Sequence, residues 1–162
     1  MLTFPIINHI IMMLAIIPHS GLSMWLNSTA QNALQAVLHL AELGGSAPVR
    51  VGDIATALGV PRNYLSKTMH ILAREGILVS TRGPRGGFAL SYPPELLVLA
   101  QVVRPFVATG ARPCLVGRAT CSDASPCAAH HQWAQVAASV ESFFGQTTIA
   151  DLLRSAPSPQ PA

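Results

Sequence analysis

Apolar residues recur every three or four positions between Ser28 and Ala41, the period of one face of an α-helix. Ser28 and Gln31 have the spacing of a capping box, and Gly44-Gly45 follows the last apolar position. This pattern predicts an amphipathic helix that ends at the two glycines. Its apolar face is formed by Ala30, Ala33, Leu34, Val37, Leu38 and Ala41.

Residues 51–74 predict a short helix, a tight turn and a second helix. Gly59 supplies the turn, and Pro61 suits the first position of the second helix, which runs to about residue 74. Apolar residues face inward in both helices, at Ile54, Ala55, Leu58, Leu65, Met69 and Leu72. The opposite face of the second helix is polar and basic, and carries Arg62, Asn63, Ser66, Lys67, His70 and Arg74. This order is the helix-turn-helix arrangement.

A β-hairpin is predicted next. Residues 77–81 form one strand, the glycine-rich segment RGPRGG forms the turn, and residues 88–90 form the returning strand. A hairpin after a helix-turn-helix is a winged helix, and its tip would bring Arg82 and Arg85 to a DNA backbone or minor groove. The alternative is an ordinary hairpin loop. A nucleotide-binding loop is disfavoured, because Gly-Lys-Ser/Thr is absent and no helix opens after the turn.

The remaining residues predict helices with more apolar surface than a small winged helix can cover. We expect helices at residues 95–107 and 128–144, the latter capped by Gly145, and a short helix 149–153 capped by Thr148 and Asp151. The tail from Ser155 is expected to be disordered. The apolar stripe of helix 128–144 is formed by Trp133, Val136, Ala137, Val140, Phe143 and Phe144. The chain is therefore predicted to be mainly α-helical, with pairing to a second subunit.

Residues 1–23 contain no lysine or arginine. Their apolar run, Ile6–Ile17, is too short for a confident membrane span, and the positive region of a signal peptide is missing. We expect these residues to precede the functional start at Met24 or to form a disordered extension. The prediction is a cytoplasmic protein without a membrane partner.

The positive charge of the chain is concentrated in one region. The formal net charge is +3, whereas residues 49–90 hold six basic residues, among them Arg50, and two acidic ones. A local net of +4 suits a surface that meets phosphates, although a merely solvated face would have the same composition.

All three cysteines lie in one segment, with the spacing C-x6-C-x5-C followed by C-x2-H. These residues are Cys114, Cys121, Cys127 and His130. Thiolate and imidazole are ligands of zinc and of iron–sulfur clusters. An odd number of cysteines cannot form a closed disulfide set, and no Cys-x-x-Cys is present. A cluster, a Cys3His zinc site and a thiol/disulfide switch stay open, whereas a cysteine-based enzyme lacks a recognisable general base.

From Met24 to Arg154 the sequence resembles the family of bacterial winged-helix repressors that includes IscR, NsrR and CymR. The matching segments are MWLNSTAQNALQAVLHLA, DIATALGVPRNYLSKTMHIL, EGILVSTRGPRGGFAL, the cysteine loop and TTIADLL. The resemblance implies a homodimer held by the helix after the cysteines. It also implies a pseudo-palindromic operator read by the helix that begins near Pro61, with Asn63, Tyr64, Ser66 and Lys67 nearest the bases.

The resemblance further implies that the three cysteines bind an iron–sulfur cluster that controls DNA binding, in response to nitric oxide, iron–sulfur status or redox stress. His130 stands where members with a [2Fe-2S] cluster place a histidine ligand, which favours [2Fe-2S] over [4Fe-4S]. Arg85 departs from the family, because glycine is usual there. On this basis we divide the chain into an extension (1–23), a winged helix-turn-helix domain (24–92), a cluster loop with dimerisation helices (93–154) and a tail (155–162).

Overall fold

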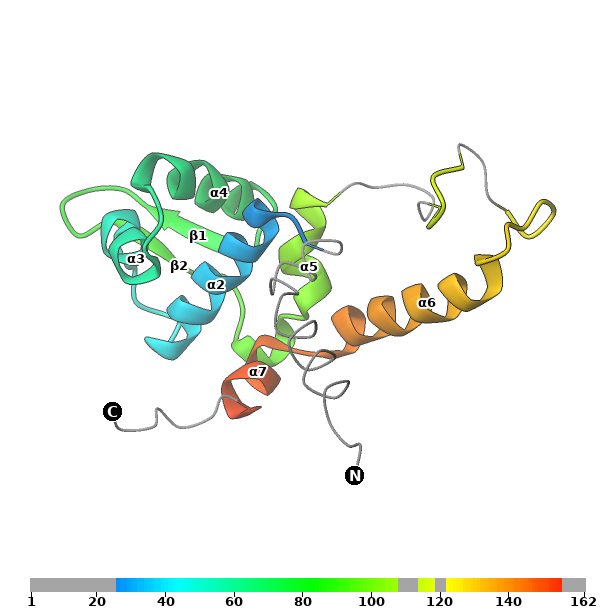
Figure 1. The fold of residues 1–162 in the computed structure, drawn as a ribbon. Coiled ribbons are helices and arrows are strands. Elements are labelled where there is room, and N and C mark those ends of the chain that lie inside the picture. The colour runs from blue at the N-terminus through cyan, green and yellow to red at the C-terminus, as the bar shows by residue number, and fades with distance from the viewer. Residues whose placement is uncertain (1–25, 108–113, 119–121, 156–162) are drawn as a thin grey trace, which may run out of the picture.

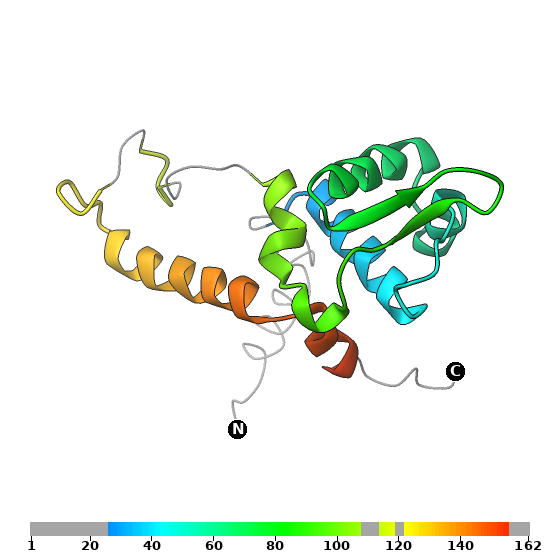
Figure 2. The same ribbon diagram turned by 180° about the vertical axis from the view of Figure 1, so that it is seen from behind.

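The computed structural model describes residues 26–107, 114–118 and 122–155, which form six α-helices and one two-stranded hairpin (Figures 1 and 2). The mainly α-helical, winged class predicted from the sequence is confirmed. In the order of the chain, the elements are α2 (Ser28–Glu42), α3 (Val51–Leu58), α4 (Arg62–Arg74), β1 (Leu78–Thr81), β2 (Gly87–Leu90), the 3-10 turn η2 (Pro94–Leu96), α5 (Leu99–Val103), the 3-10 turn η3 (Arg104–Phe106), α6 (His130–Gln146) and α7 (Ile149–Ser155).

The N-cap of helix α2 lies one residue before the position that the sequence pattern predicts. The N-cap is Asn27, whose Oδ1 accepts the backbone N–H of Ala30 at 2.9 Å. The predicted capping box of Ser28 and Gln31 is therefore wrong, since the Gln31 side chain donates to the carbonyl of Leu26 instead. Asn and Ser cap helices about equally well, so the propensities alone do not decide between neighbours.

The helix-turn-helix of α3 and α4 is confirmed. Gly59 ends α3 at φ +65°, in the left-handed region that glycine enters without strain. Pro61 is the N-cap of α4 and not its first helical residue, because its ψ of 127° is extended. Leu65, Met69 and Leu72 are fully buried, as the pattern predicts.

The wing is an antiparallel hairpin in which Leu78 pairs with Leu90 and Thr81 with Gly87. A third segment adds to it, because the N–H groups of Val49 and Phe88 each donate to the other's carbonyl, at 2.9 and 2.8 Å. Gly87 is required at this crossing, since a Cβ there would lie 2.3 Å from the Val49 oxygen. The segment before α3 thus completes the sheet.

The predicted continuous helix 95–107 is wrong. Its residues form η2, the short α5 and η3. Leu97 and Val98 are extended and separate η2 from α5, which η3 follows directly. Val98 pairs with Thr148 in an isolated antiparallel bridge, which takes backbone groups that a helix would use. Pro105 lies in η3 and has no N–H to continue the α-helical ladder.

Helix α6 extends away from the winged helix (Figures 1 and 2). It runs two residues beyond the predicted end, and Gly145 is a helical residue instead of the cap. Ala137 of the predicted stripe is buried, whereas Val136 and Phe143 are about half exposed. Thr147 and Thr148 connect α6 to α7.

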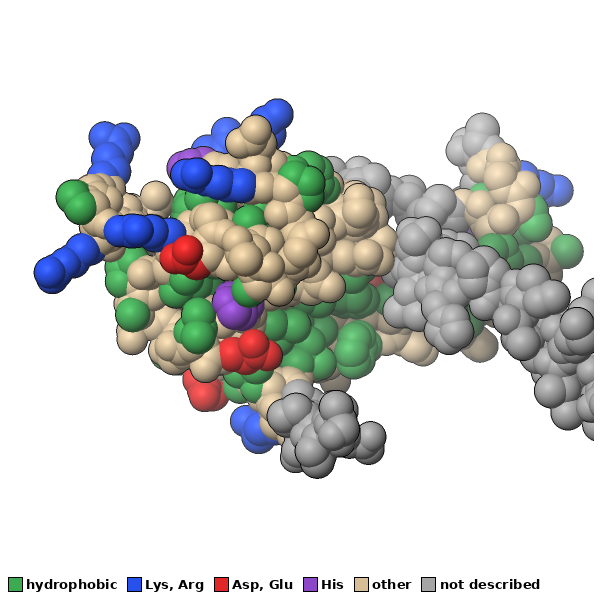
Figure 3. All heavy atoms as spheres, turned by 60° about the vertical axis from the view of Figure 1, so that its left-hand side comes forward, with side chains coloured by type: hydrophobic (Ala, Val, Ile, Leu, Met, Phe, Trp, Pro, Cys, Tyr) green, Lys and Arg blue, Asp and Glu red, His purple; other side chains and the backbone are tan. Residues whose placement is uncertain are grey.

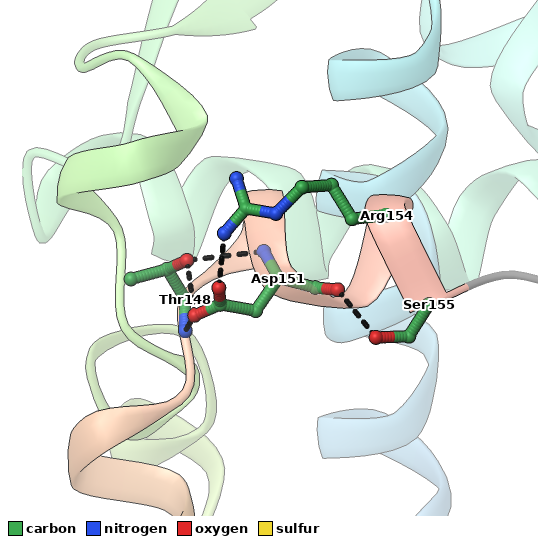
Figure 4. Close-up of polar contacts among 4 residues, drawn as sticks. All are labelled: Thr148, Asp151, Arg154 and Ser155. Carbon is green, nitrogen blue, oxygen red and sulfur yellow. Dashed lines mark hydrogen bonds and ion pairs between the residues drawn. The ribbon is translucent and has the colours of Figure 1, made fainter.

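The predicted cap of α7 is confirmed (Figure 4). The Asp151 carboxylate accepts the N–H and the hydroxyl of Thr148 at 2.9 and 2.7 Å, and the Thr148 hydroxyl accepts the N–H of Asp151 at 3.1 Å. The helix extends to Ser155, which was expected in the tail, because its hydroxyl donates to the Asp151 carbonyl at 2.9 Å. Residues 156–162 lie outside the described part of the chain.

One hydrophobic core joins the two ends of the fold. Leu40 of α2, Leu65 of α4 and Ile149 of α7 belong to the same buried cluster, and none is exposed to solvent. Within residues 26–107, 114–118 and 122–155, no helix has both the length and the apolar character to cross a membrane. The expected extension 1–23 and the start at Met24 lie outside these residues.

Candidate DNA interface and metal centre

The outer face of α4 presents the polar side chains that the sequence predicts. Arg62, Asn63, Lys67 and His70 are exposed, while Ser66 is partly buried. The buried face of the same helix packs on α2 and α3, which fixes its orientation. The helix therefore offers a polar, basic surface on a rigid support, as a major-groove reading helix requires.

Two side chains of α4 are held by neighbouring elements. The hydroxyl of Tyr64 shares a hydrogen bond with the hydroxyl of Thr29, in the first turn of α2. The ring of His70 lies edge-on to Phe88 of the wing, with centroids 5.3 Å apart. Thr29 was not predicted as a site residue, and no sequence signal connects it with a residue 35 positions away.

An arginine side chain connects the start of α3 to the wing. Arg50, the N-cap residue of α3, donates from its guanidinium to the carbonyl of Pro84 at the tip of the wing. A cleft of about 450 Å³ lies between α3, α4 and the wing, and is lined in part by Arg50, Arg62 and His70. Arg50 was predicted to contact DNA, and the structure gives it a second role in holding the wing.

The basic side chains gather on one side of the molecule, around the wing and α4 (Figure 3). Arg82 and Arg85 are exposed in the wing turn, and Arg62 and Lys67 are exposed on α4. Asp53 also lines the cleft and is the one acidic residue among its described lining. Phosphate groups would meet a positive surface here, and association would weaken as salt increases.

The described part of the cysteine segment brings two thiols together. The Sγ atoms of Cys114 and Cys127 lie 3.8 Å apart, and Cys127 is buried. A disulfide has its sulfurs about 2.05 Å apart, so these are separate thiols. Cys121 lies outside the described residues.

His130 is the first residue of α6 and only 2% exposed. Its backbone N–H donates to the carbonyl of Cys127 at 3.0 Å, so the C-x2-H spacing places both residues on one turn. Its Nε2 lies 2.8 Å from Oδ1 of Asp123. Asp123 was not predicted as a site residue, although it is the one acidic residue between Glu95 and Glu141 and follows Cys121 by two positions.

Among the cysteine, histidine and acidic side chains of this segment that the structure describes, Cys114 lies close to Cys127 and Asp123 lies close to His130. Among the residues that the structure places, no group of three or more such side chains converges on one point. The thiol pair has the spacing that a metal would need. Two thiolates bound at about 2.3 Å to one tetrahedral ion lie about 3.8 Å apart.

One hydrogen bond links the start of α2 to the end of η3, which precedes the cysteine segment in the chain. Asn27 caps α2 and also donates from its side-chain amide to the carbonyl of Phe106, at 2.5 Å. Phe106 ends η3, immediately before the segment that leads to Cys114. Two residues further along α2, Thr29 holds Tyr64.

The family model described as "Iron-dependent Transcriptional regulator", Rrf2, matches residues 26–155. The chain belongs to the Rrf2 family. This Rrf2 protein is 35% identical over 130 residues to an Aquifex aeolicus protein named as an HTH-type transcriptional regulator, which covers 78% of this chain and 90% of that one. It is 27% identical over 131 residues to IscR of Vibrio atlanticus, with 81% of this chain and 76% of that one covered.

Solved structures agree with the fold of this Rrf2 protein. CymR, the global cysteine regulator of B. subtilis, has a TM-score of 0.69 at 20% identity, covering 82% of this chain and 98% of that one. IscR of T. potens has a TM-score of 0.65 at 25% identity, covering 86% and 95%. The family model and the A. aeolicus relative show that the Rrf2 protein is a DNA-binding transcriptional regulator and not an enzyme, as the sequence predicts.

Proposed function

We propose that this protein is a repressor whose operator binding is controlled by an iron–sulfur cluster held by Cys114, Cys121, Cys127 and His130. The observation that carries the proposal is the 3.8 Å separation of the Cys114 and Cys127 sulfurs, which fits two thiolates on one tetrahedral metal ion. The description of the matching family as iron-dependent supports iron as the metal.

The separation of the thiol pair favours a [2Fe-2S] cluster over a [4Fe-4S] cluster. Each iron of a [2Fe-2S] cluster takes two protein ligands, so Cys114 and Cys127 would share one iron, whereas each iron of a [4Fe-4S] cluster takes only one. Burial of Cys127 and His130 limits access of water to the cluster's sulfur and iron. When bound, the cluster supplies a group that gains or loses electrons and reacts with nitric oxide or oxidants.

We propose that the protein acts as a homodimer joined through α6. Only His130 and Ala137 of this 17-residue helix are buried, while Val136 and Phe143 are 49% and 52% exposed. An exposed apolar helix face that extends from the fold is suited to the same face of a second copy. A dimer would place two α4 helices about 34 Å apart, on the half-sites of a pseudo-palindromic operator.

The hydrogen bonds at the start of α2 could couple the cysteine segment to α4. A shift of the chain near Phe106 would act on the N-terminus of α2, because the Asn27 amide donates a hydrogen bond to the Phe106 carbonyl. Thr29, in the first turn of α2, shares a hydrogen bond with Tyr64 of α4. Cluster loading or loss would then bias α2 and α4 between two arrangements of different operator affinity.

A thiol/disulfide switch is the second candidate. The same 3.8 Å separation favours it, because oxidation would need to bring the Cys114 and Cys127 sulfurs only to about 2.05 Å. Zinc would also fit the thiol pair. These alternatives retain the DNA-binding role and change only the signal.

The test is anaerobic purification from Met24, followed by an ultraviolet–visible spectrum and iron and sulfide analysis. We expect [2Fe-2S] bands that are lost in Cys127→Ala and altered in His130→Ala, with salt-dependent operator binding that differs between loaded and cluster-free protein. Ser125→Ala, in the same loop, is the matched control and should retain the bands. A protein that stays colourless and iron-free after anaerobic reconstitution would overturn the proposal and direct attention to the thiol switch or zinc.

A further inference from the structure

Asp123 lies in a tight turn that aims one of its oxygens at His130. The N–H of Ser125 donates to the carbonyl of Ser122 at 3.0 Å, and the same two residues form an isolated antiparallel bridge. Asp123 is the second residue of this turn. Its side chain is 98% exposed, yet its Oδ1 lies 2.8 Å from the His130 Nε2. The turn of residues 122–125 thus positions the Asp123 carboxylate beside His130.

The ring of His130 is held on several sides. It is 2% exposed, it sits at the first position of α6, and its backbone is tied to Cys127. The ring of His131 lies edge-on to it, with centroids 5.3 Å apart. The imidazole therefore has one stable direction, and Asp123 meets one particular nitrogen of it.

The chemistry of the pair determines where the ring proton lies. An ionised carboxylate only accepts hydrogen bonds, so Nε2 is the donor and carries the proton. A neutral imidazole protonated on Nε2 has its lone pair on Nδ1. Metal-binding histidines commonly donate their other N–H to a carboxylate, which fixes the ring and increases the basicity of the ligating nitrogen.

We propose that Asp123 is a positioning residue that keeps the proton of His130 on Nε2, so that Nδ1 is the nitrogen that binds iron. The part that concerns iron rests on the proposed cluster, whereas the tautomer is a property of the cluster-free protein. The competing arrangement is a weak surface pair that breaks when the cluster binds through Nε2, because exposed ion pairs contribute little.

Histidine NMR of the cluster-free chain tests the tautomer. Long-range ¹H–¹⁵N spectra are recorded above the ordinary histidine pKa of about 6.5, with His130 assigned by its loss in His130→Gln. We expect the Nε2–H pattern for His130 in the wild type and a mixture of both tautomers in Asp123→Ala. A wild type with the proton on Nδ1, or a variant with unchanged populations, would overturn the proposal.

The chain offers a matched control in Glu42→Ala. Glu42 also lies near a histidine, with its Oε2 3.8 Å from Nδ1 of His39, but at the end of α2 and outside the cysteine segment. This variant removes the same charge, so it should leave the His130 spectrum unchanged. Since Asp123 is exposed, both variants should keep the fold, which circular dichroism and thermal unfolding would check.

The loaded protein tests the iron-binding part. Without Asp123, we expect cluster loss to a chelator to be roughly tenfold faster, the lower end of the range for removal of such a carboxylate. The reduction potential should rise, because a less basic imidazole stabilises the oxidised cluster less. Values equal to those of Glu42→Ala would overturn this part. A wild type that binds no cluster would overturn the proposed function, while NMR would still decide the tautomer.

Discussion

Gly87 shows how a single hydrogen atom in place of a methyl group permits the wing. A Cβ on this residue would lie 2.3 Å from the Val49 oxygen and 2.5 Å from its carbon. The neighbouring Gly86 has a similar constraint, 2.3 Å from the Thr81 oxygen. Both contacts are with backbone, which cannot rotate away. The two glycines are thus required by packing, whereas the exposed position of Arg85 leaves room for a side chain.

We expect Gly87→Ala to destabilise the fold by about 1–3 kcal/mol and to weaken DNA binding, because the β2–Val49 pairing must open. Thermal unfolding and fluorescence anisotropy on a duplex would measure both. Gly145→Ala is the matched control, since nothing lies within 4 Å of a Cβ added in α6. It should stabilise by up to about 1 kcal/mol. Equal effects of the two substitutions would contradict the steric argument.

Asp151 makes the stability of α7 depend on pH. The hydrogen bond from the Thr148 hydroxyl is the largest cause that holds the pKa of Asp151 below its ordinary value of 3.8, followed by the Thr148 N–H and by Arg154. Because the folded pKa is below the unfolded one, the carboxylate stabilises the fold above the unfolded pKa. That contribution is lost as the pH falls through the folded pKa.

We therefore expect Asp151→Asn to unfold at a lower temperature than the wild type at neutral pH. The difference should shrink as the pH falls below about 4. Thermal unfolding followed by circular dichroism between neutral and acidic pH would measure it. The control is Glu95→Gln, an exposed carboxylate in η2. If the difference in unfolding temperature between wild type and Asp151→Asn grew as the pH fell, the predicted direction of the pH dependence would be wrong.

At the scale of elements, α2 connects parts of the chain that the sequence keeps apart. Its N-terminal residues Asn27 and Thr29 contact Phe106 and Tyr64. Its buried face packs on α4 and on the C-terminal elements. A change at the N-terminus of α2 would thus reach α4 through this helix.

We expect Thr29→Val and Tyr64→Phe each to weaken operator binding, since each removes one hydroxyl of the same hydrogen bond. Their effects should not add in the double variant, and the coupling energy should be about 0.5 kcal/mol or more. Anisotropy titrations on one operator give all four affinities. Ser66→Ala, on the same helix but outside this bond, should combine additively with Thr29→Val. Full additivity of the first pair would contradict the link between α2 and α4.

Local periodicity predicted α2, α3 and α4 well, because each has one apolar face, and Gly44-Gly45 and Gly59 mark the ends of the first two. The glycine-rich turn predicted the hairpin. It failed at residues 95–107, where nearly every residue is apolar and no face is distinguished. There the pairing of Val98 with Thr148 decides the backbone. Sequence spacing also pointed to Cys127 and His130, but it could not identify Asp123, whose role depends on a turn that aims its carboxylate.

At the scale of the whole molecule, α6 is an extended arm with an exposed apolar face. It contacts α5 near its base, and Figures 1 and 2 show that the rest of it points away from the winged helix. Val136 and Phe143 lie seven positions apart, which places them on one side of the helix. The proposed dimer would bury this side.

We expect Phe143→Glu to shift the protein to monomer and to weaken operator binding at least tenfold, because a half-site alone loses the contacts of the second α4. Sedimentation velocity and anisotropy would measure both effects. The control is Glu141→Ala, which changes an exposed polar residue of the same helix. Dimers that persist in Phe143→Glu would place the interface elsewhere.

The shared core also sets the order in which the protein can mature during synthesis. Leu40, Leu65 and Ile149 pack in one cluster, so the winged helix is incomplete until the residues beyond the cysteine segment have left the ribosome. We expect nascent chains arrested before Ile149 to be cut by protease within the helix-turn-helix, and chains arrested well after it to resist. A newly made protein would then acquire a finished DNA-binding surface only after its cysteines have been exposed to the cell.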